Sequence, residues 1–186
     1  MLFSIENNFL TGARLVDSPN KDERPAGIEP DLLIIHNISL PPGQYNTGRI
    51  DQLFCNQLNK DEHPYFLDIA ELRVSSHLCI DRVGKVTQYV PFNLRAWHAG
   101  ESFYAGLPNC NDYAIGIELE GTDFEDFTAA QYDSLILVTN LLIGEYTCLN
   151  SDRIVGHSDV APGRKTDPGP CFDWVRYKSA IAIHCA

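Results

Sequence analysis

The sequence predicts a single α/β domain. Segments with the two-residue period of strands alternate with segments that have the three- and four-residue spacing of helices, and loops rich in proline and glycine separate them. A length of 186 residues falls within the range of one domain, and 44% hydrophobic with 21% charged residues is typical of a globular chain. We therefore expect one domain over residues 1–186, large enough to bury a core of its own.

The first half of the chain predicts a strand, a helix and a hairpin. The apolar run 32–36 predicts a buried strand, and residues 49–58 have helical spacing. Residues 77–80 and 85–90 have the composition of strands and flank a short connection that contains Gly84. A glycine in a connection of this length is typical of a β-hairpin.

Residues 113–121 predict a strand in which apolar and other side chains alternate. Ile115, Ile117 and their neighbours fall on one face, and Glu118 and Glu120 fall on the other. We therefore expect Glu118 on the face opposite the core.

The second half continues with a long helix, a short strand and a closing helix. Thr128 and Gln131 match a capping box at the start of a helix over 129–146. Residues 153–157 predict a short strand, and 172–183 predict the last helix.

Two loops, 38–49 and 91–112, are long for a compact domain. Long ordered loops are commonly binding surfaces or lids, so we expect them near a functional site.

Charge and cysteine content restrict the function classes. A formal net charge of −11 opposes docking on nucleic acid or on an anionic membrane, since both require a basic surface. The first ten residues lack the pattern of an export signal, and no apolar run is long enough to span a bilayer. The six cysteines are scattered without a CxxC pair, which predicts reduced core thiols. We expect a cytoplasmic monomer that binds neither nucleic acid nor membrane.

Two of the six histidines close apolar strands. His36 ends one predicted strand and His157 ends another, so in a common sheet they would converge at one edge. Zn²⁺ accepts imidazole nitrogen and carboxylate oxygen, and a catalytic zinc ion has three protein ligands with one position left for water. The third ligand would be Asp159 or Asp167, and spacing does not decide between them.

The other four histidines carry weaker signals. His63 and His184 lie in polar or terminal contexts and predict surface residues. His77 at a strand start and His98 in a loop remain undecided, with His98 a candidate for substrate binding rather than metal ligation.

Glu118 and Lys165 are candidates for the chemistry beside such a metal. A carboxylate next to an activated water acts as a general base, and a fixed ammonium stabilises a developing oxyanion. The competing interpretation is structural, with Glu118 on an exposed strand face and Lys165 simply solvated.

Four sequence strings resemble one enzyme family. They are IIHNIS at 34–39, RAWHAG at 95–100, IGIELEG at 115–121 and GHSDVAPGRKTDPG at 156–169. In this order they resemble the zinc-dependent N-acetylmuramoyl-L-alanine amidases, and more narrowly the cytoplasmic 1,6-anhydro-N-acetylmuramoyl-L-alanine amidases of Gram-negative bacteria. The resemblance extends over about residues 12–180.

The resemblance implies the composition of the site. It implies a single zinc amidase domain with one zinc ion per chain, bound by His36, His157 and Asp167. It leaves Asp159 as a neighbour that is not a ligand, and it matches Glu118 and Lys165 to the catalytic positions. It further implies that the muropeptide substrate is contacted by Asn37, Arg73, Trp97 and Arg164.

The resemblance also implies a fold and an activity. The fold is a central mixed β-sheet flanked by helices. The activity is hydrolysis of the amide bond between 1,6-anhydro-N-acetylmuramic acid and L-alanine during peptidoglycan recycling. Loss of this activity would let anhydro-muropeptides accumulate and signal β-lactamase induction. Two alternatives remain: an exported or phage-type amidase that acts on intact peptidoglycan, and a non-catalytic module that only binds muropeptides.

Overall fold

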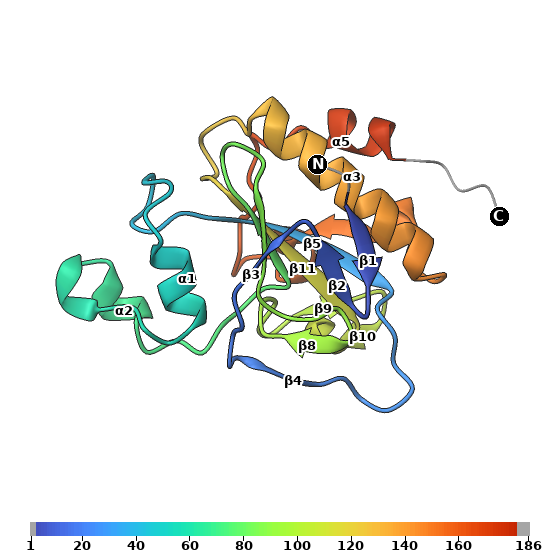
Figure 1. The fold of residues 1–186 in the computed structure, drawn as a ribbon, viewed down its shortest axis with the longest axis horizontal. Coiled ribbons are helices and arrows are strands. Elements are labelled where there is room, and N and C mark those ends of the chain that lie inside the picture. The colour runs from blue at the N-terminus through green and yellow to red at the C-terminus, as the bar shows by residue number, and fades with distance from the viewer. Residues whose placement is uncertain (1–2, 182–186) are drawn as a thin grey trace.

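A six-stranded mixed sheet forms the centre of the molecule (Figure 1). The computed structural model describes residues 3–181. The strands lie in the order β12 (Ile154–Gly156), β5 (Leu32–Ile38), β11 (Ala114–Glu120), β6 (Leu78–Ile80), β7 (Val86–Gln88) and β3 (Arg14–Leu15). The first four run parallel, β7 is antiparallel to β6, and β3 is parallel to β7. This arrangement confirms the predicted α/β class and the mixed sheet.

The two central strands are buried on both faces. All seven residues of β11 are buried, including Glu118 with 8% of its surface exposed. The sequence alternation correctly separates two faces, but the interpretation of Glu118 as an exposed strand residue is wrong. A central parallel strand is covered on both sides, so a polar residue in it faces a second layer of the protein rather than solvent.

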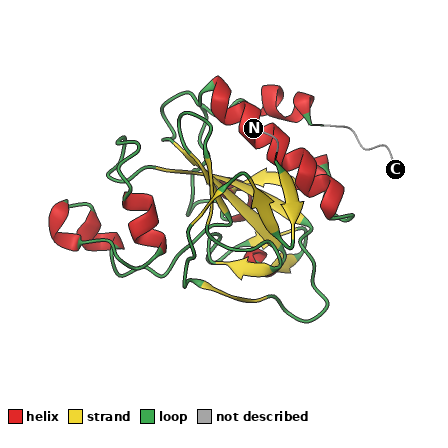
Figure 2. Cartoon of the chain, in the orientation of Figure 1, coloured by secondary structure: helices red, strands yellow, loops and turns green. Residues whose placement is uncertain are grey.

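One face of the sheet is covered by two helices, α3 (Ala129–Glu145) and α5 (Trp174–Ala180), which lie together in Figure 2. The predicted capping box begins α3, where Gln131 N donates to Thr128 Oγ1 at 3.1 Å and Thr128 N donates to Gln131 Oε1 at 3.0 Å. The apolar side of α3 packs on the sheet in the main core cluster. The helix predicted over 172–183 starts later, since Asp173 Oδ1 accepts from Arg176 N and caps α5.

The second face carries shorter elements on the opposite side of Figure 1: α1 (Arg49–Phe54), η1 (Lys60–Glu62) and α2 (Phe66–Ile69). Their buried side chains form a separate apolar cluster against β6 and the residues after β7. The helix predicted over 49–58 ends at Phe54, because Asn56 adopts a left-handed conformation with φ of 59°. Asparagine tolerates that conformation better than other non-glycine residues, and it is a common helix terminator.

The strand predicted to end at His157 stops one residue earlier. His157 is instead the first residue of the short helix α4 (His157–Val160), whose N-terminus is capped by Asp159 Oδ2 accepting from Gly156 N at 2.7 Å. The local carboxylate therefore turns the chain at the sheet edge, which places His157 at the beginning of a helix.

Several short elements are packed around the main sheet. Three two-stranded ladders pair β1 (Ser4–Glu6) with β2 (Phe9–Thr11), β4 (Lys21–Glu23) with β8 (Leu94–Ala96), and β9 (Phe103–Tyr104) with β10 (Leu107–Pro108). The 3₁₀ helices η2 (Cys110–Asp112) and η3 (Ser151–Arg153) complete the fold. The predicted loop 91–112 thus contains three short strands and a helical turn.

The buried guanidinium of Arg24 holds this segment against the sheet. Its Nη1 donates to the carbonyls of Asn111 and Asp112 at 3.2 and 3.0 Å, and its Nη2 donates to those of Phe92 and Ala114 at 3.2 and 2.9 Å. Because one charged side chain donates to carbonyls at both ends of the segment, Arg24 ties these ends together.

The cysteines only partly follow the prediction of core thiols. The five cysteines in residues 3–181 are free, but only Cys79 and Cys110 are buried, and Cys148 is exposed. Cys185 lies outside the described residues. None of the helices in the described part of the chain has the length and apolarity needed to cross a membrane.

Candidate metal centre and active site

Three candidate ligand atoms meet at one edge of the sheet. His36 Nδ1 lies 2.9 Å from His157 Nδ1, and each of these atoms lies 3.0 Å from Asp167 Oδ2. His36 and His157 are 1% and 3% exposed. Within the described residues, these three side chains form the group of potential ligands that is compact enough to hold one metal ion.

Strand register explains why the two imidazoles meet. In the parallel pair β5 and β12, Ile35 lies opposite Gly156. The residues that follow them are His36, still in β5, and His157, the first residue of α4. Asp167 returns to this edge after the turn that follows α4, and its carbonyl accepts from Ser158 N at 2.9 Å. The predicted convergence of the two histidines is therefore confirmed.

The tautomer of His157 and the pKa values of His36 and Asp167 make this group suitable for a cation. His157 Nε2 lies 3.1 Å from the carbonyl of Ala99, so it carries the proton and leaves a lone pair on Nδ1. Burial lowers the pKa of His36 to about 4, so that ring is neutral at pH 7. Burial opposes ionisation of Asp167, but the adjacent imidazoles more than offset it and lower its pKa. Two imidazole nitrogens and a carboxylate oxygen that face one another match the donor set of zinc.

Glu118 lies beside this group on β11. Its Oε2 is buried and has no hydrogen-bond partner among the described residues. Burial raises the pKa of Glu118 well above its usual value, the charge of Asp167 adds to this effect, and Lys165 opposes it. An unpaired buried carboxyl next to a candidate metal centre is the arrangement expected of a proton-transfer group.

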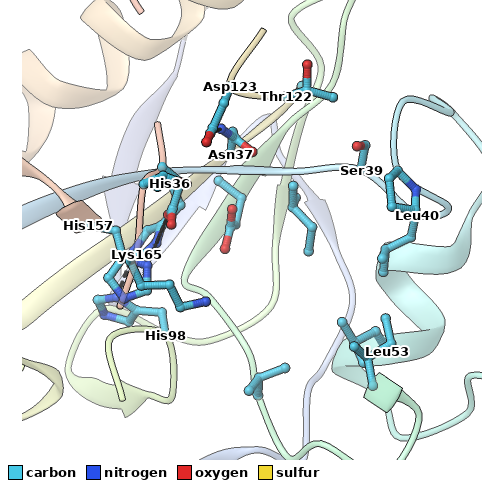
Figure 3. Close-up of a pocket in the computed structure, with 18 of the residues that line it drawn as sticks. His36, Asn37, Ser39, Leu40, Leu53, His98, Thr122, Asp123, His157 and Lys165 are labelled. Carbon is cyan, nitrogen blue, oxygen red and sulfur yellow. Dashed lines mark hydrogen bonds and ion pairs between the residues drawn. The ribbon is translucent and has the colours of Figure 1, made fainter. Parts of the chain in front are cut away.

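The group opens into a cavity of about 530 Å³. Figure 3 shows the imidazoles of His36, His98 and His157 at one end and the apolar side chains of Leu40 and Leu53 at the other. The cavity therefore offers a polar reaction end and an apolar end. Lys165 is an exposed residue on its lining at the polar end.

Three of the four predicted substrate contacts line the cavity, and each already has a protein partner. Asn37 Nδ2 donates to Asp123 Oδ1 at 2.6 Å, and Trp97 Nε1 donates to Asp22 Oδ1 at 3.0 Å. Arg164 Nη2 donates to the carbonyls of Ala99 and Glu101 at 2.5 and 2.6 Å. Arg73 is exposed and lies outside the cavity lining, with its guanidinium 3.4 Å from the carbonyl of Glu71.

The remaining predicted residues have structural or peripheral places. Asp159 caps α4 and does not join the ligand group. His77 is fully buried, with Nδ1 accepting from Gly116 N and Nε2 donating to the carbonyl of Leu94. His63 is half-buried against Phe66. His184, predicted as a surface residue, lies outside the described residues.

Sequence reasoning missed the role of two neighbours. His98 Nδ1 lies 3.0 Å from His36 Nε2, a contact across 62 positions that no local pattern predicts. Asp123 also lines the cavity. It follows the carboxyl end of β11, and ligand sites gather at the carboxyl ends of parallel strands, so that rule provided a usable signal.

Comparisons with known proteins agree with this geometry. A family model described as N-acetylmuramoyl-L-alanine amidase matches residues 26–170. The 1,6-anhydro-N-acetylmuramyl-L-alanine amidase AmpD of Enterobacter cloacae is 53% identical over 95% of this chain and 94% of its own length. A crystal structure of selenomethionine-labelled AmpD superposes with a TM-score of 0.94 at 50% identity, covering 98% of this chain and all of that one.

A more distant solved structure contains a substrate. It is the Escherichia coli amidase AmiD in complex with anhydro-N-acetylmuramic acid-L-Ala-D-γ-Glu-L-Lys. Its TM-score to this chain is 0.62 at 26% identity, over 96% of this chain and 65% of that one.

Proposed function

Because the chain belongs to the N-acetylmuramoyl-L-alanine amidase family, we propose that it hydrolyses the amide bond between 1,6-anhydro-N-acetylmuramic acid and L-alanine during peptidoglycan recycling. The observation that carries this proposal is the position of the buried Glu118 beside the compact group of His36, His157 and Asp167 in an open cavity. A module that only binds muropeptides has no need of an unpaired buried carboxyl at such a group.

We assign one zinc ion per chain to His36, His157 and Asp167, whose donor atoms lie within 4.8 Å of one another. A zinc ion bound there supplies a Lewis acid that polarises an amide carbonyl and lowers the pKa of water toward ~7. The carboxylate of Asp167 offsets part of the positive charge, and the carbonyl of Ala99 fixes the His157 tautomer that ligation requires.

Glu118 acts as the general base. Its carboxylate takes a proton from the water molecule that attacks the lactyl amide carbon. The new C–O bond forms as the carbonyl π electrons move to oxygen. Burial, which raises the pKa of this carboxyl, lets it keep the proton until the C–N bond breaks. It then delivers the proton to the departing amine of L-alanine, and so returns to its starting state.

Lys165 stabilises the negative charge that develops on the carbonyl oxygen. Its ammonium group is a compact charge on the cavity lining, and it offsets part of the rise in the pKa of Glu118 that burial causes. Such a group contributes most when the oxygen becomes an anion, which makes it a transition-state contact.

The muropeptide lies in the cavity and contacts Asn37, Trp97 and Arg164. The partners of these three side chains hold them in place before substrate binds, which reduces the entropy lost on binding. Arg73 lies outside the cavity lining, so it would contact only a part of the substrate that extends beyond it.

We further propose that the protein acts as a cytoplasmic monomer. A net charge of −11 and five free cysteines in the described residues support this proposal. Its partner is then a soluble muropeptide.

The test compares two substrates. Zinc-loaded protein is incubated either with soluble 1,6-anhydro-muropeptide or with intact sacculi, and released peptide is measured by mass spectrometry. We expect peptides with a free L-alanine amine from the soluble substrate and much slower release from sacculi. Comparable rates on sacculi would favour the wall-acting alternative, and no cleavage of either substrate would refute the amidase assignment.

A further inference from the structure

We propose that the two-residue segment His98–Ala99 orients both imidazoles of the candidate metal centre, and that Asn111 is the positioning residue that holds this segment in place. This inference rests on the proposed function, because it concerns the two histidines assigned there as ligands. It explains how one loop controls two side chains that come from different strands.

The first contact joins His157 to Ala99. His157 Nε2 donates to the Ala99 carbonyl at 3.1 Å, and both residues are buried. A carbonyl can only accept, so this bond requires the proton on Nε2 and leaves the Nδ1 lone pair for a metal. A hydrogen bond to the outer nitrogen of a ligand imidazole is the usual device that fixes its tautomer and its ring orientation.

The second contact joins His36 to His98. The two rings meet edge to face at 87°, with His36 Nε2 lying 3.0 Å from His98 Nδ1. For His36 Nδ1 to face the metal without a proton, its Nε2 must carry the proton and donate it to His98. The opposite nitrogen of His98, Nε2, is buried without a partner among the described residues. Among the described residues, the contact with His36 is therefore the hydrogen bond that the His98 ring makes.

The His98 ring has a dedicated seat on the central strand. It lies against Gly116 of β11 so closely that a Cβ atom there would be 2.5 Å from His98 Cγ. Only glycine permits this approach, so the ring is placed by packing as well as by its hydrogen bond.

Asn111 determines the position of both contacts with a single atom. Its Oδ1 accepts from His98 N at 3.1 Å and from Ala99 N at 2.8 Å. The carbonyl of Asn111 in turn accepts from the buried guanidinium of Arg24 at 3.2 Å. A continuous series of hydrogen bonds thus runs from Arg24 through Asn111 to the two ligand histidines.

A matched pair of substitutions at His98 separates hydrogen bonding from packing. His98→Asn keeps an acceptor oxygen near the position of Nδ1 in a smaller side chain, and His98→Leu fills the space better but removes the acceptor. Asn111 provides a second pair. Asn111→Asp keeps the acceptor for the main-chain N–H groups of His98 and Ala99, and Asn111→Leu removes it. If packing alone mattered, His98→Leu would be the milder change at that position.

The readout is zinc affinity of the full-length chain, measured by competition with a chromogenic chelator. We expect His98→Leu and Asn111→Leu to weaken zinc binding by about 10- to 100-fold, the range reported for outer hydrogen-bond partners of metal ligands. His98→Asn and Asn111→Asp should bind zinc more tightly than their leucine counterparts. Nitrogen-15 NMR of the zinc-free protein should also show His157 protonated at Nε2 in the wild type and a mixture of tautomers in Asn111→Leu.

Two results would overturn the inference. One is zinc affinity of both leucine variants equal to that of the wild type, and the other is leucine variants that bind more tightly than the polar ones. Failure of the metal assignment itself has a different signature, because the wild type would then bind zinc no more tightly than Asp167→Ala. Thermal unfolding of each zinc-free variant identifies any that is misfolded, and the other pair then decides the result.

Discussion

Glu118 of β11 lies directly opposite His36 of β5 in the parallel register of the two central strands. The proposed general base and a proposed metal ligand are therefore held on adjacent strands whose register extends over seven residue pairs. Neither side chain depends on a mobile loop for its position relative to the other. Such a base is preorganised, which favours reaction over mere binding.

Glu118→Gln should lower kcat by on the order of 10²-fold or more while zinc remains bound, since the amide cannot accept the proton from water. Glu120→Gln is the matched control on the same strand face. Glu120 accepts from Asn46 N at 2.5 Å and from Arg82 N at 3.4 Å, so its loss should affect stability more than kcat. Steady-state kinetics and metal analysis check both variants, and equal losses of kcat would assign Glu118 a structural role.

Glu118→Gln should also stabilise the zinc-free protein at high pH. Burial, with the charge of Asp167, raises the pKa of Glu118 in the folded chain above the usual value of 4.5, and Lys165 only partly offsets this. Between the two pKa values the folded chain binds more protons than the unfolded chain, so stability falls as pH rises through that window. Urea unfolding in chelator should give similar midpoints for wild type and variant at pH 4 and a higher midpoint for the variant at pH 8. A wild type that is more stable at pH 8 would contradict this.

Asp167→Ala should abolish tight zinc binding, and Asp159→Ala should not. Asp159 caps α4 through Gly156 N, so its removal should cost about 1 kcal/mol of stability. Metal content after dialysis and the free energy of unfolding together distinguish the two roles. Loss of zinc from Asp159→Ala alone would show that the ligand set is wrong.

Lys165→Ala should reduce kcat and kcat/KM by similar factors, because its ammonium interacts with charge that exists only in the transition state. Lys165→Arg should restore only part of the loss, since a planar guanidinium places its charge differently. Arg164 lines the cavity and is proposed to contact the muropeptide, so Arg164→Ala should mainly raise KM. If Lys165→Ala raised KM with kcat unchanged, the lysine would be a substrate contact only.

Gly116→Ala should displace the His98 ring, because the added methyl group would lie 2.5 Å from His98 Cγ. We expect a loss of stability on the order of 1–3 kcal/mol from overpacking, together with weaker zinc binding. Gly144→Ala is the control, as a Cβ there meets nothing within 4 Å and Gly144 lies in α3. That substitution should stabilise the helix by about 0.5–1 kcal/mol and leave zinc binding unchanged. Unfolding curves and zinc titrations compare the two variants.

The parts of the fold that sequence predicted are those with a strong local pattern. Residues 32–36 form a nearly continuous apolar run, as expected of a parallel strand buried on both faces, and the capping box at Thr128 marks the start of α3. The predicted strand ends were misplaced, because β5 continues past His36 to Ile38 and His157 begins α4. They were still close enough to predict that the two histidines converge. These signals are local, because they arise from the backbone period and from caps.

Other features depend on contacts between distant segments. The strands β1 to β4 are two or three residues long, too short for a period to be visible. His98 and Asn111 become part of the metal centre only through loop packing against Gly116 and Arg24. The ligand role of Asp167 was implied by resemblance to a family, since spacing alone did not distinguish it from Asp159.

The buried Arg24 has a consequence for the limits of the folding unit. The match to the amidase family covers residues 26–170, yet Arg24 lies before that range and Tyr177, which is fully buried with its hydroxyl 2.6 Å from Thr139 Oγ1, lies after it. A fragment trimmed to 26–170 would remove the Arg24 donor from the carbonyls that it serves, at a cost of about 1–3 kcal/mol for each buried carbonyl left without a partner. It would also lose β4, which pairs with β8, and α5, which packs on α3. The span that the family model matches is thus shorter than the span this protein needs to hold its own active site together.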